Sequence, residues 1–274
     1  MVAIAVTGKG GVGKTTLVAN LGVYFTLRGY KTLLIDGDLY LPKLAIHFGI
    51  LNPRWTLHNL LRRGSKLKPS DVIYKDPKTG VHIIPGSQDI YALKGITQGR
   101  LDHIADGIRR SYDVTIIDTP VGIPFEVVST FSLARYQLVV LEPGRDPMSS
   151  ERRFLEDEAL KFKFMGDRFN MRTALGLNKV MEDMDDLVDS ILVDLDEKIP
   201  VLGSVTYDSD VEGSLPKGSP ILSLKEGGKA VDDIVLMGQF LETWMYSFKE
   251  EPGGSVNYKI EREGAYAGVG IQDS

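Results

Sequence analysis

Apolar residues occur along this chain both in short continuous runs and in longer segments mixed with polar residues, and the two patterns predict different elements. Short apolar runs rich in β-branched residues are typical of buried strands. They predict strands at 2–6, 31–36, 81–85, 113–118, 136–142, 172–178 and 199–205. Longer segments of mixed character predict helices at 16–28, 98–111, 148–165, 183–197 and 227–249, with short helices broken by prolines over 40–75. Elements in this order predict an α/β fold, with a mostly parallel central sheet and helices on both faces.

The same pattern predicts one folded domain followed by a tail. A length of 274 residues suits a single large α/β domain, and no linker divides the chain before residue 251. We therefore predict a domain over 1–250. The segment 251–274 is rich in glycine and poor in large aliphatic residues, which predicts a flexible C-terminal tail. The alternative is a partner-binding tail anchored by Tyr258 and Tyr266.

A glycine-rich loop lies between the first predicted strand and the first predicted helix. It reads Gly-Lys-Gly-Gly-Val-Gly-Lys-Thr-Thr over residues 8–16. Gly8, four further residues, then Gly13, Lys14 and Thr15 form the pattern of a phosphate-binding loop. A turn without a ligand is the alternative, but a strand, a glycine loop and a helix in this order place a helix N-terminus on an anion. The loop therefore predicts a site for a nucleoside triphosphate.

The loop residues have distinct chemical tasks in such a site. Backbone N–H groups of the turn point at phosphate oxygens, Lys14 reaches the β and γ phosphates, and the Thr15 hydroxyl binds Mg²⁺. Lys9 is not required by this pattern. A second cation brought into the site from another molecule would make hydrolysis depend on assembly. Lys9 therefore suggests that two copies of the protein build one active site.

Aspartates end two of the predicted strands. Asp36 and Asp38 follow the second strand, and Asp118 ends the strand at 113–118. The carboxyl ends of parallel strands face the ligand crevice, so all three carboxylates are expected near the phosphates. An ordinary aspartate, with a pKa of about 3.9, is a weak base at neutral pH, so Asp38 is expected to position the attacking water. The alternative is that Asp36 and Asp38 cap the turn after their strand.

Asp118 begins a second informative segment, Asp-Thr-Pro-Val-Gly over 118–122. An apolar strand that ends in aspartate matches the magnesium side of phosphate-loop ATPases. The proline and glycine that follow suit a segment that changes shape when the γ-phosphate leaves.

Composition excludes several classes of protein. The absence of cysteine excludes disulfides, thiolate catalysis, iron–sulfur clusters and cysteine-bound zinc. A net charge of −5 argues against a surface that embraces nucleic acid. No apolar run approaches the length of a membrane span, and the N-terminus enters a predicted strand at once, which leaves no room for a signal peptide. We therefore expect a cytoplasmic protein.

Taken together, the loop with Lys9, the Asp36-Gly-Asp38 segment and the Asp118-Thr-Pro-Val-Gly segment resemble the deviant Walker A ATPases of the MinD/ParA class. The resemblance extends from residue 1 to about 248 and is closer to the MinD side. It implies a single-domain P-loop NTPase, ATP/ADP and Mg²⁺ as cofactors, and an ATP-dependent homodimer.

The resemblance also implies a role for each matching residue. Lys9 would reach the nucleotide of the partner subunit, Thr16 would hold the α-phosphate, and Asn178 would hydrogen-bond adenine. The implied catalytic residues are Lys9, Lys14 and Asp38. The implied nucleotide contacts are Gly8, Lys9, Gly10, Gly11, Val12, Gly13, Lys14, Thr15, Thr16, Asn178, Lys179, Tyr207 and Asp208. The implied metal residues are Thr15, Asp36, Asp38 and Asp118, with Asp118 acting on magnesium from a distance.

Partner binding is where the chain departs from the family. Membrane-cycling members end in a basic amphipathic helix that this sequence does not show, so membrane binding is in question. The apolar stripe over 231–248 is expected to be core, and the basic stretch at 62–68 is expected to be a solvated helix end. The acidic stretch at 182–186 would repel lipid or DNA phosphates, so we do not expect DNA binding.

These features favour a slow, partner-stimulated ATPase that acts as a dimerisation switch and positions or partitions a cellular component, as in cell division. An activator or cargo protein is expected, but no residue pattern identifies it. Three alternatives stay open: a ParA-like DNA partition ATPase, a small-molecule kinase or synthetase on the same loop, and a nucleotide-gated binding module that hardly hydrolyses. The second needs an acceptor pocket, and the sequence shows no recognisable one.

Overall fold

The structure is a computed structural model. It describes residues 2–96, 108, 111–121, 134–143, 149–181, 195–196, 198–224 and 227–247. The helices predicted at 98–111 and 183–197 lie almost wholly outside these residues, as does the predicted tail at 251–274.

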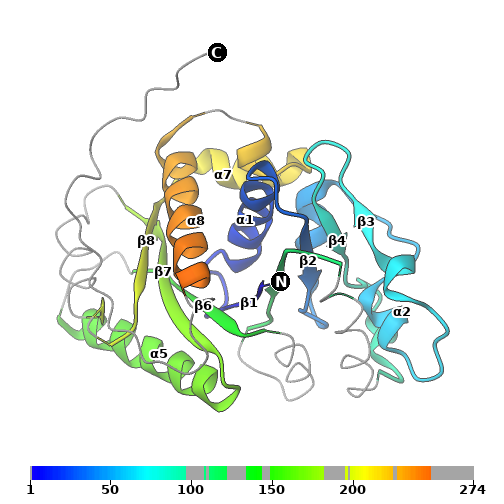
Figure 1. The fold of residues 1–274 in the computed structure, drawn as a ribbon, viewed down its shortest axis with the longest axis horizontal. Helices are drawn as coiled ribbons and strands as arrows, with labels where there is room; N and C mark the ends of the chain where they lie inside the picture. The colour runs from blue at the N-terminus through cyan, green and yellow to red at the C-terminus, as the bar shows by residue number, and fades with distance from the viewer. Residues whose placement is uncertain are drawn as a thin grey trace.

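The described residues form one sheet of eight strands in the order β3-β4-β2-β5-β1-β6-β7-β8 (Figure 1). The strands are β1 (Val2–Thr7), β2 (Thr32–Asp36), β3 (Tyr74–Lys75), β4 (His82–Ile84), β5 (Val114–Asp118), β6 (Tyr136–Leu141), β7 (Arg172–Val180) and β8 (Val201–Thr206). Every neighbouring pair is parallel except β3 and β4, which are antiparallel. All seven predicted strands are present, and β3 is an addition.

Helices cover both faces of the sheet. α1 (Lys14–Leu27) and α8 (Lys229–Ser247) pack together on one face, and α5 (Ser149–Arg168) packs on β6 and β7 (Figure 1). The alternation of side chains along β1 explains this arrangement, because Ile4 joins the cluster under α1 and α8 whereas Ala5 joins a separate cluster on the other face. The predicted α/β fold with a mostly parallel, two-sided sheet is confirmed.

Short helices join the strands. They are η1 (Leu44–Phe48), α2 (Leu57–Leu61), η2 (Pro69–Val72), η3 (Ile90–Leu93), α7 (Ser209–Ser214), η6 (Leu215–Lys217) and η7 (Ile221–Ser223). The broken helices predicted over 40–75 are present as η1, α2 and η2. The basic stretch at 62–68 follows α2, and its arginines and lysines are exposed, as expected for a solvated helix end.

The apolar stripe of α8 is core. Its residues Val231, Ile234, Met237, Leu241, Trp244 and Met245 are buried. They pack with the apolar side chains of α1 and β1, so the stripe predicted at 231–248 faces the protein interior over its described length. Across the described ranges, no helix is both long enough and apolar enough to cross a membrane.

A cluster of hydrogen bonds fastens α8 to α1 at the edge of this core. The Glu242 carboxylate accepts hydrogen bonds from the Tyr24 hydroxyl at 2.9 Å, the Tyr30 hydroxyl at 2.6 Å and the Arg28 Nε at 3.3 Å. Burial acts to raise the pKa of Glu242, but the hydrogen bonds from Tyr30, Tyr24 and Arg28 outweigh it and lower the pKa below its ordinary value. The charged carboxylate is therefore the form that stabilises the fold.

We expect the substitution Glu242→Gln to lower the free energy of unfolding by about 1–2 kcal/mol at pH 7, because it weakens hydrogen bonds to a charged acceptor. The wild-type contribution is complete above pH 4.5, the ordinary pKa of a glutamate, and is lost as the pH falls through the lower folded-state pKa. Urea unfolding between pH 3 and pH 7 measures both effects.

The exposed pair Lys163–Asp167 on α5, with 2.8 Å between Nζ and Oδ2, offers a matched control. Asp167→Asn is expected to change stability by less than about 0.5 kcal/mol. Equal losses for Glu242→Gln and Asp167→Asn would contradict the prediction.

Candidate nucleotide-binding site

The glycine-rich loop occupies a tight space between the ends of three strands. β1 ends at Thr7 and α1 begins at Lys14, so the loop spans residues 8–13 between them. A side chain at Gly8 would overlap the Val140 carbonyl oxygen on β6, and one at Gly13 would overlap the Asn178 amide on β7. Gly13 also has a φ of 86°, in the left-handed region. The loop therefore needs glycine at these positions to pass close to β6 and β7.

Lys14 is the first residue of α1 and lies beneath the loop. Its Nζ donates hydrogen bonds to the carbonyl oxygens of Gly8 at 3.0 Å and Lys9 at 2.8 Å, and the side chain is buried. Burial lowers the pKa of Lys14, while the charges of Asp118 and Asp38 act to raise it. The Lys14 ammonium group and the N-terminus of α1 therefore both favour an anion at the loop.

Asp118 and Thr15 are in direct contact beside this lysine. The Thr15 hydroxyl donates to Asp118 Oδ2 at 2.7 Å, and Asp118 is 2% exposed. Burial raises the pKa of Asp118 to about 7, although the Thr15 hydrogen bond and the Lys14 charge act to lower it. Among the described residues, Asp118 Oδ1 has no hydrogen-bond partner. This leaves a buried acceptor atom next to the hydroxyl predicted to bind magnesium.

Asp36 and Asp38 both accept backbone hydrogen bonds from the segment that follows β2. Asp36 is fully buried, and its Oδ2 accepts from the Leu44 backbone N–H at 3.0 Å. Asp38 Oδ1 accepts from the N–H groups of Tyr40 at 3.1 Å and Leu41 at 2.9 Å. The capping alternative raised from the sequence therefore applies to Asp38, whereas Asp36 binds the start of η1.

Asp36 and Asp118 are neighbours across the sheet. They are register partners at the ends of β2 and β5. Burial raises the pKa of Asp36 well above its ordinary value, and the charge of Asp118 raises it further. Within the described part of the chain, Asp36 Oδ1 has no hydrogen-bond partner either. The strand ends thus bring two buried carboxyl groups together, as the sequence predicted.

The side chain of Lys9 extends from the phosphate loop to α5 of its own chain. Its Nζ lies 2.6 Å from Glu158 Oε2 and 3.7 Å from the centre of the Phe154 ring. Glu158 is 7% exposed. Sequence reasoning missed both partners, and the one available signal was a glutamate between apolar residues on the buried side of the predicted helix.

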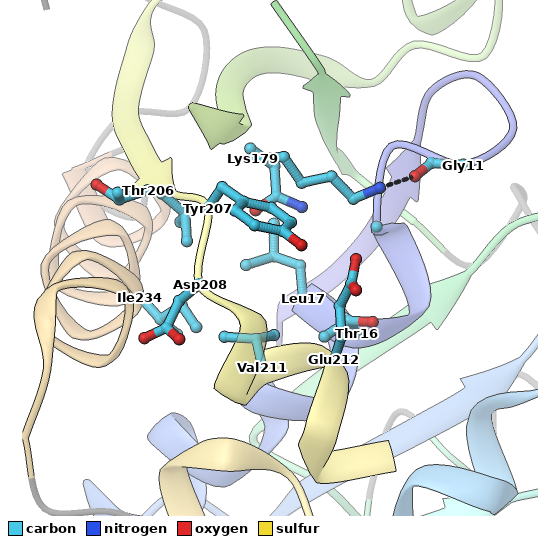
Figure 2. Close-up of a pocket in the computed structure, with 13 residues that line it drawn as sticks. Gly11, Thr16, Leu17, Lys179, Thr206, Tyr207, Asp208, Val211, Glu212 and Ile234 are labelled. Carbon is cyan, nitrogen blue, oxygen red and sulfur yellow. Dashed lines mark hydrogen bonds between the residues drawn. The ribbon is translucent and has the colours of Figure 1, made fainter. Parts of the chain in front are cut away.

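A cavity of about 190 Å³ opens beside the loop, between the ends of β7 and β8 (Figure 2). We call it the β7–β8 pocket. Its lining residues are Gly11, Gly13, Thr16, Leu17, Asn178, Lys179, Val205, Thr206, Tyr207, Asp208, Val211, Glu212 and Ile234. Four of the predicted nucleotide contacts outside the phosphate loop are therefore gathered here: Asn178, Lys179, Tyr207 and Asp208. The sequence did not predict the other lining residues, because none of them belongs to a nucleotide-binding motif: Leu17, Val205, Thr206, Val211, Glu212 and Ile234.

Side chains of β7 hold the loop against this pocket. Asn178 Nδ2 donates to the Val12 carbonyl oxygen at 2.8 Å. Lys179 Nζ donates to the Gly11 carbonyl oxygen at 2.7 Å (Figure 2). Lys179 has a φ of 60°, an unusual conformation for a lysine. The Tyr207 ring extends into the pocket, and Asp208 caps α7 by accepting from the Asp210 N–H at 2.8 Å. The pocket lining combines apolar side chains with polar ones, as is usual for a small-molecule site.

The predicted metal residues fit a magnesium ion that is bound together with phosphates. In the part of the chain that the structure describes, no three acidic or histidine side chains converge as a ready cation site. Magnesium often takes only one or two protein ligands and keeps several waters. The Thr15 hydroxyl and the unpaired oxygens of Asp36 and Asp118 are suitable for the ion and its waters.

The segment after Asp118 is hydrogen-bonded to β1, the strand that precedes the phosphate loop. The Thr119 hydroxyl donates to the Val6 carbonyl oxygen at 2.7 Å, close to the end of β1. Val121 is exposed, and residue 122 lies outside the described residues.

A family model matches most of the chain. The model of the CobQ/CobB/MinD/ParA nucleotide binding domain, CbiA, matches residues 3–221, which contain the phosphate loop, the three aspartates and most of the β7–β8 pocket. The chain belongs to this family. The resemblance to the MinD/ParA class drawn from the sequence is confirmed, as is a nucleotide-binding domain of the P-loop type.

The proteins to which this chain is similar in sequence include an ATP-binding protein and a MinD protein. An uncharacterized ATP-binding protein of Methanocaldococcus jannaschii is 34% identical over 143 residues, 52% of this chain and 53% of that protein. The chain thus spans about half the length of that relative. A putative septum site-determining protein MinD of Oltmannsiellopsis viridis is 28% identical over 232 residues, 81% of this chain and 69% of that protein.

Solved MinD structures share the fold. The cell division ATPase MinD of Pyrococcus furiosus superposes with a TM-score of 0.73 at 25% identity, over 89% of this chain and 99% of that one. The septum site-determining protein MinD of Pyrococcus horikoshii, solved with Mg-ADP, superposes with a TM-score of 0.76 at 22% identity, over 89% of this chain and 96% of that one. Both superpositions are consistent with the resemblance to MinD that was drawn from the sequence.

Proposed function

We propose that this family member binds ATP or ADP with Mg²⁺, hydrolyses ATP to ADP and phosphate, and acts as a nucleotide-driven dimerisation switch that positions or partitions a cellular component. Lys9 is the observation that carries the proposal. It is a second lysine in the phosphate loop, and in the single chain it is turned toward Glu158. The likeness to MinD ATPases supports the same activity.

The residues of the loop would bind the nucleotide. Lys14 and the backbone N–H groups at the start of α1 would hold the phosphates, and Thr15 with Asp118 would hold the magnesium ion and its waters. When bound, magnesium neutralises the charge that develops on the transferred phosphoryl group. The residues of the β7–β8 pocket would hold the nucleoside.

Asp38 would orient the attacking water. Two backbone N–H groups fix one oxygen of its carboxylate, so the side chain has a defined direction. Its charge acts to raise the pKa of Lys14, which supports a position near the proposed phosphate site. Phosphoryl transfer needs little proton abstraction early, so positioning is the contribution that an ordinary carboxylate makes best.

Pairing of two copies would require Lys9 to change its partner. In the single chain its charge is satisfied by the Glu158 carboxylate and the Phe154 ring. A phosphate of the nucleotide on a second copy offers a stronger acceptor in a site from which water is excluded. ATP would therefore favour the paired state, and hydrolysis would end it.

Sedimentation of the Asp38→Ala protein tests the proposal, because blocked hydrolysis should hold the ATP state. We expect a dimer with ATP and Mg²⁺, a monomer with ADP, and a monomer with ATP when Lys9→Ala is added. Lys163→Ala is the matched control, since Lys163 is a lysine on α5 that pairs with Asp167. It should leave the dimer intact. A monomer under every condition would contradict the proposal.

One observation favours a second candidate, a small-molecule kinase or synthetase. A cavity of about 260 Å³ lies beside Asp36, and it is lined mainly by polar and small residues of the segments 50–56 and 86–89. It is large enough to hold a small acceptor molecule next to the predicted phosphate site. ATP turnover that depends strictly on an added metabolite would support this candidate, whereas turnover with water alone would exclude it.

A further inference from the structure

A buried histidine connects two loops at the carboxyl edge of the sheet. His58 lies in α2 and is 1% exposed. Its Nε2 lies 2.8 Å from the Leu39 carbonyl oxygen, and the Ser87 backbone N–H donates to its Nδ1 at 3.0 Å. Leu39 directly follows Asp38, and Ser87 belongs to the loop that leaves β4. One ring therefore bridges the segment that carries Asp38 to the neighbouring strand end.

The two hydrogen bonds determine the state of the ring. A backbone N–H can only donate, so Nδ1 must accept from Ser87 and carries no proton. The ring proton is then on Nε2, which donates to Leu39. Burial lowers the pKa of His58, although the Leu39 hydrogen bond and the charges of Asp38 and Asp89 act to raise it. The neutral ring with this tautomer satisfies both partners at once.

α2 is itself fixed to the strand end, which makes the bridge rigid. The Leu57 N–H, one residue before His58, donates to the Pro85 carbonyl oxygen at 2.8 Å. Pro85 directly follows β4, and β4 pairs with β2 in the sheet. The segment at 38–41 is therefore held from both sides, by its own Asp38 cap and by the His58 ring.

We propose that His58 is a positioning residue for hydrolysis, which holds the backbone next to Asp38 so that its carboxylate meets the attacking water. The inference rests on the proposed ATPase function. Loss of the ring would leave the Leu39 carbonyl, in a residue only 3% exposed, without its buried donor. The segment would then shift to find another partner, and a misplacement of about 1 Å can slow a reaction by as much as about 100-fold.

A second buried histidine provides the matched control. His47 lies in η1 and is 5% exposed, and burial lowers its pKa to about 4. In the described ranges its Nδ1 has no hydrogen-bond partner. His47→Leu removes a buried ring of the same size and close in sequence to Asp38, but it removes no bond to Leu39.

The test compares His58→Leu, His58→Gln and His47→Leu with the wild type for thermal unfolding, ATP affinity and single-turnover hydrolysis. We expect His58→Leu to slow hydrolysis by about tenfold or more while the Kd for ATP changes by less than about twofold. His58→Gln has an amide that can both donate and accept, so it should recover part of the rate. His47→Leu should hydrolyse at the wild-type rate.

Three outcomes separate the proposals. Equal rates for His58→Leu and wild type would overturn the role of His58 and leave the ATPase function intact. Equal losses of rate in His58→Leu and His47→Leu would show a structural role and overturn the inference as well. No hydrolysis by the wild type, with or without added protein partners, would overturn the proposed function itself.

Discussion

Replacing Lys14 with methionine is expected to reduce the affinity for ATP by about 100-fold or more, because hydrogen bonds to charged groups are worth about 1.5–3 kcal/mol each. Lys14 is the buried cation at the start of α1, and its Nζ already lies against the loop carbonyls of Gly8 and Lys9. Methionine keeps most of the length of the side chain, without the terminal ammonium group, and removes its charge. Titration with a fluorescent ATP analogue measures the effect.

Lys179→Met is the matched control for this prediction. The Lys179 Nζ also donates to a loop carbonyl, that of Gly11, but its side chain is 31% exposed and lies at the wall of the β7–β8 pocket. We expect a loss of affinity below about tenfold, as for one exposed interaction. Equal losses for the two variants would contradict the role given to Lys14.

The substitution Asp118→Asn is expected to stabilise the nucleotide-free protein at pH 8 while it weakens the binding of Mg-ATP. The pKa of Asp118 is raised from 3.8 to about 7, chiefly by burial. Between these values the folded state holds a proton that the unfolded state has lost, so stability falls as the pH rises from about 4 to 7. At pH 8 the charged carboxylate therefore costs stability, on the order of 2–4 kcal/mol.

Asparagine removes this cost and keeps an oxygen for the Thr15 hydroxyl. Thermal unfolding in EDTA should show Asp118→Asn above the wild type at pH 8 and close to it at pH 4. Asp113→Asn is the control, because Asp113 is exposed and directly precedes β5, the strand that Asp118 ends. This substitution should not stabilise the protein at pH 8. A wild type that is as stable at pH 8 as at pH 5 would refute the argument.

The sequence predicts those parts of the site whose residues can be recognised from the pattern immediately around each of them. Gly8, Gly13, Lys14 and Thr15 are adjacent in sequence and in space, so their pattern alone predicts the phosphate loop. Asp36 and Asp118 are far apart in sequence, but each ends an apolar run, and parallel pairing brings such ends together. The first step rests on the phosphate-loop pattern, and the second on a general property of parallel sheets.

The parts that the sequence does not predict depend on packing between distant elements. Glu158 meets Lys9 only because α5 packs beside the loop, and the one sequence signal, a glutamate on the buried side of that helix, does not identify Lys9 as its partner. His58 lies in a five-residue helix, which is too short for a periodic pattern to separate a buried polar residue from an exposed one. The direction of the Asp38 carboxylate depends on the turn at 38–41, which the strand pattern does not describe.

The short strand β3 has a consequence for how copies of this protein can meet. An outer strand of a sheet offers unpaired backbone groups to any other chain, and such edges promote aggregation. Here the outermost strand on one side has two residues, Tyr74 and Lys75, runs against its neighbour, and ends in an exposed lysine. This edge is too short and too charged to extend the sheet into a second molecule. It discourages indiscriminate pairing along that side, which is consistent with the proposal that two copies associate through a bound nucleotide.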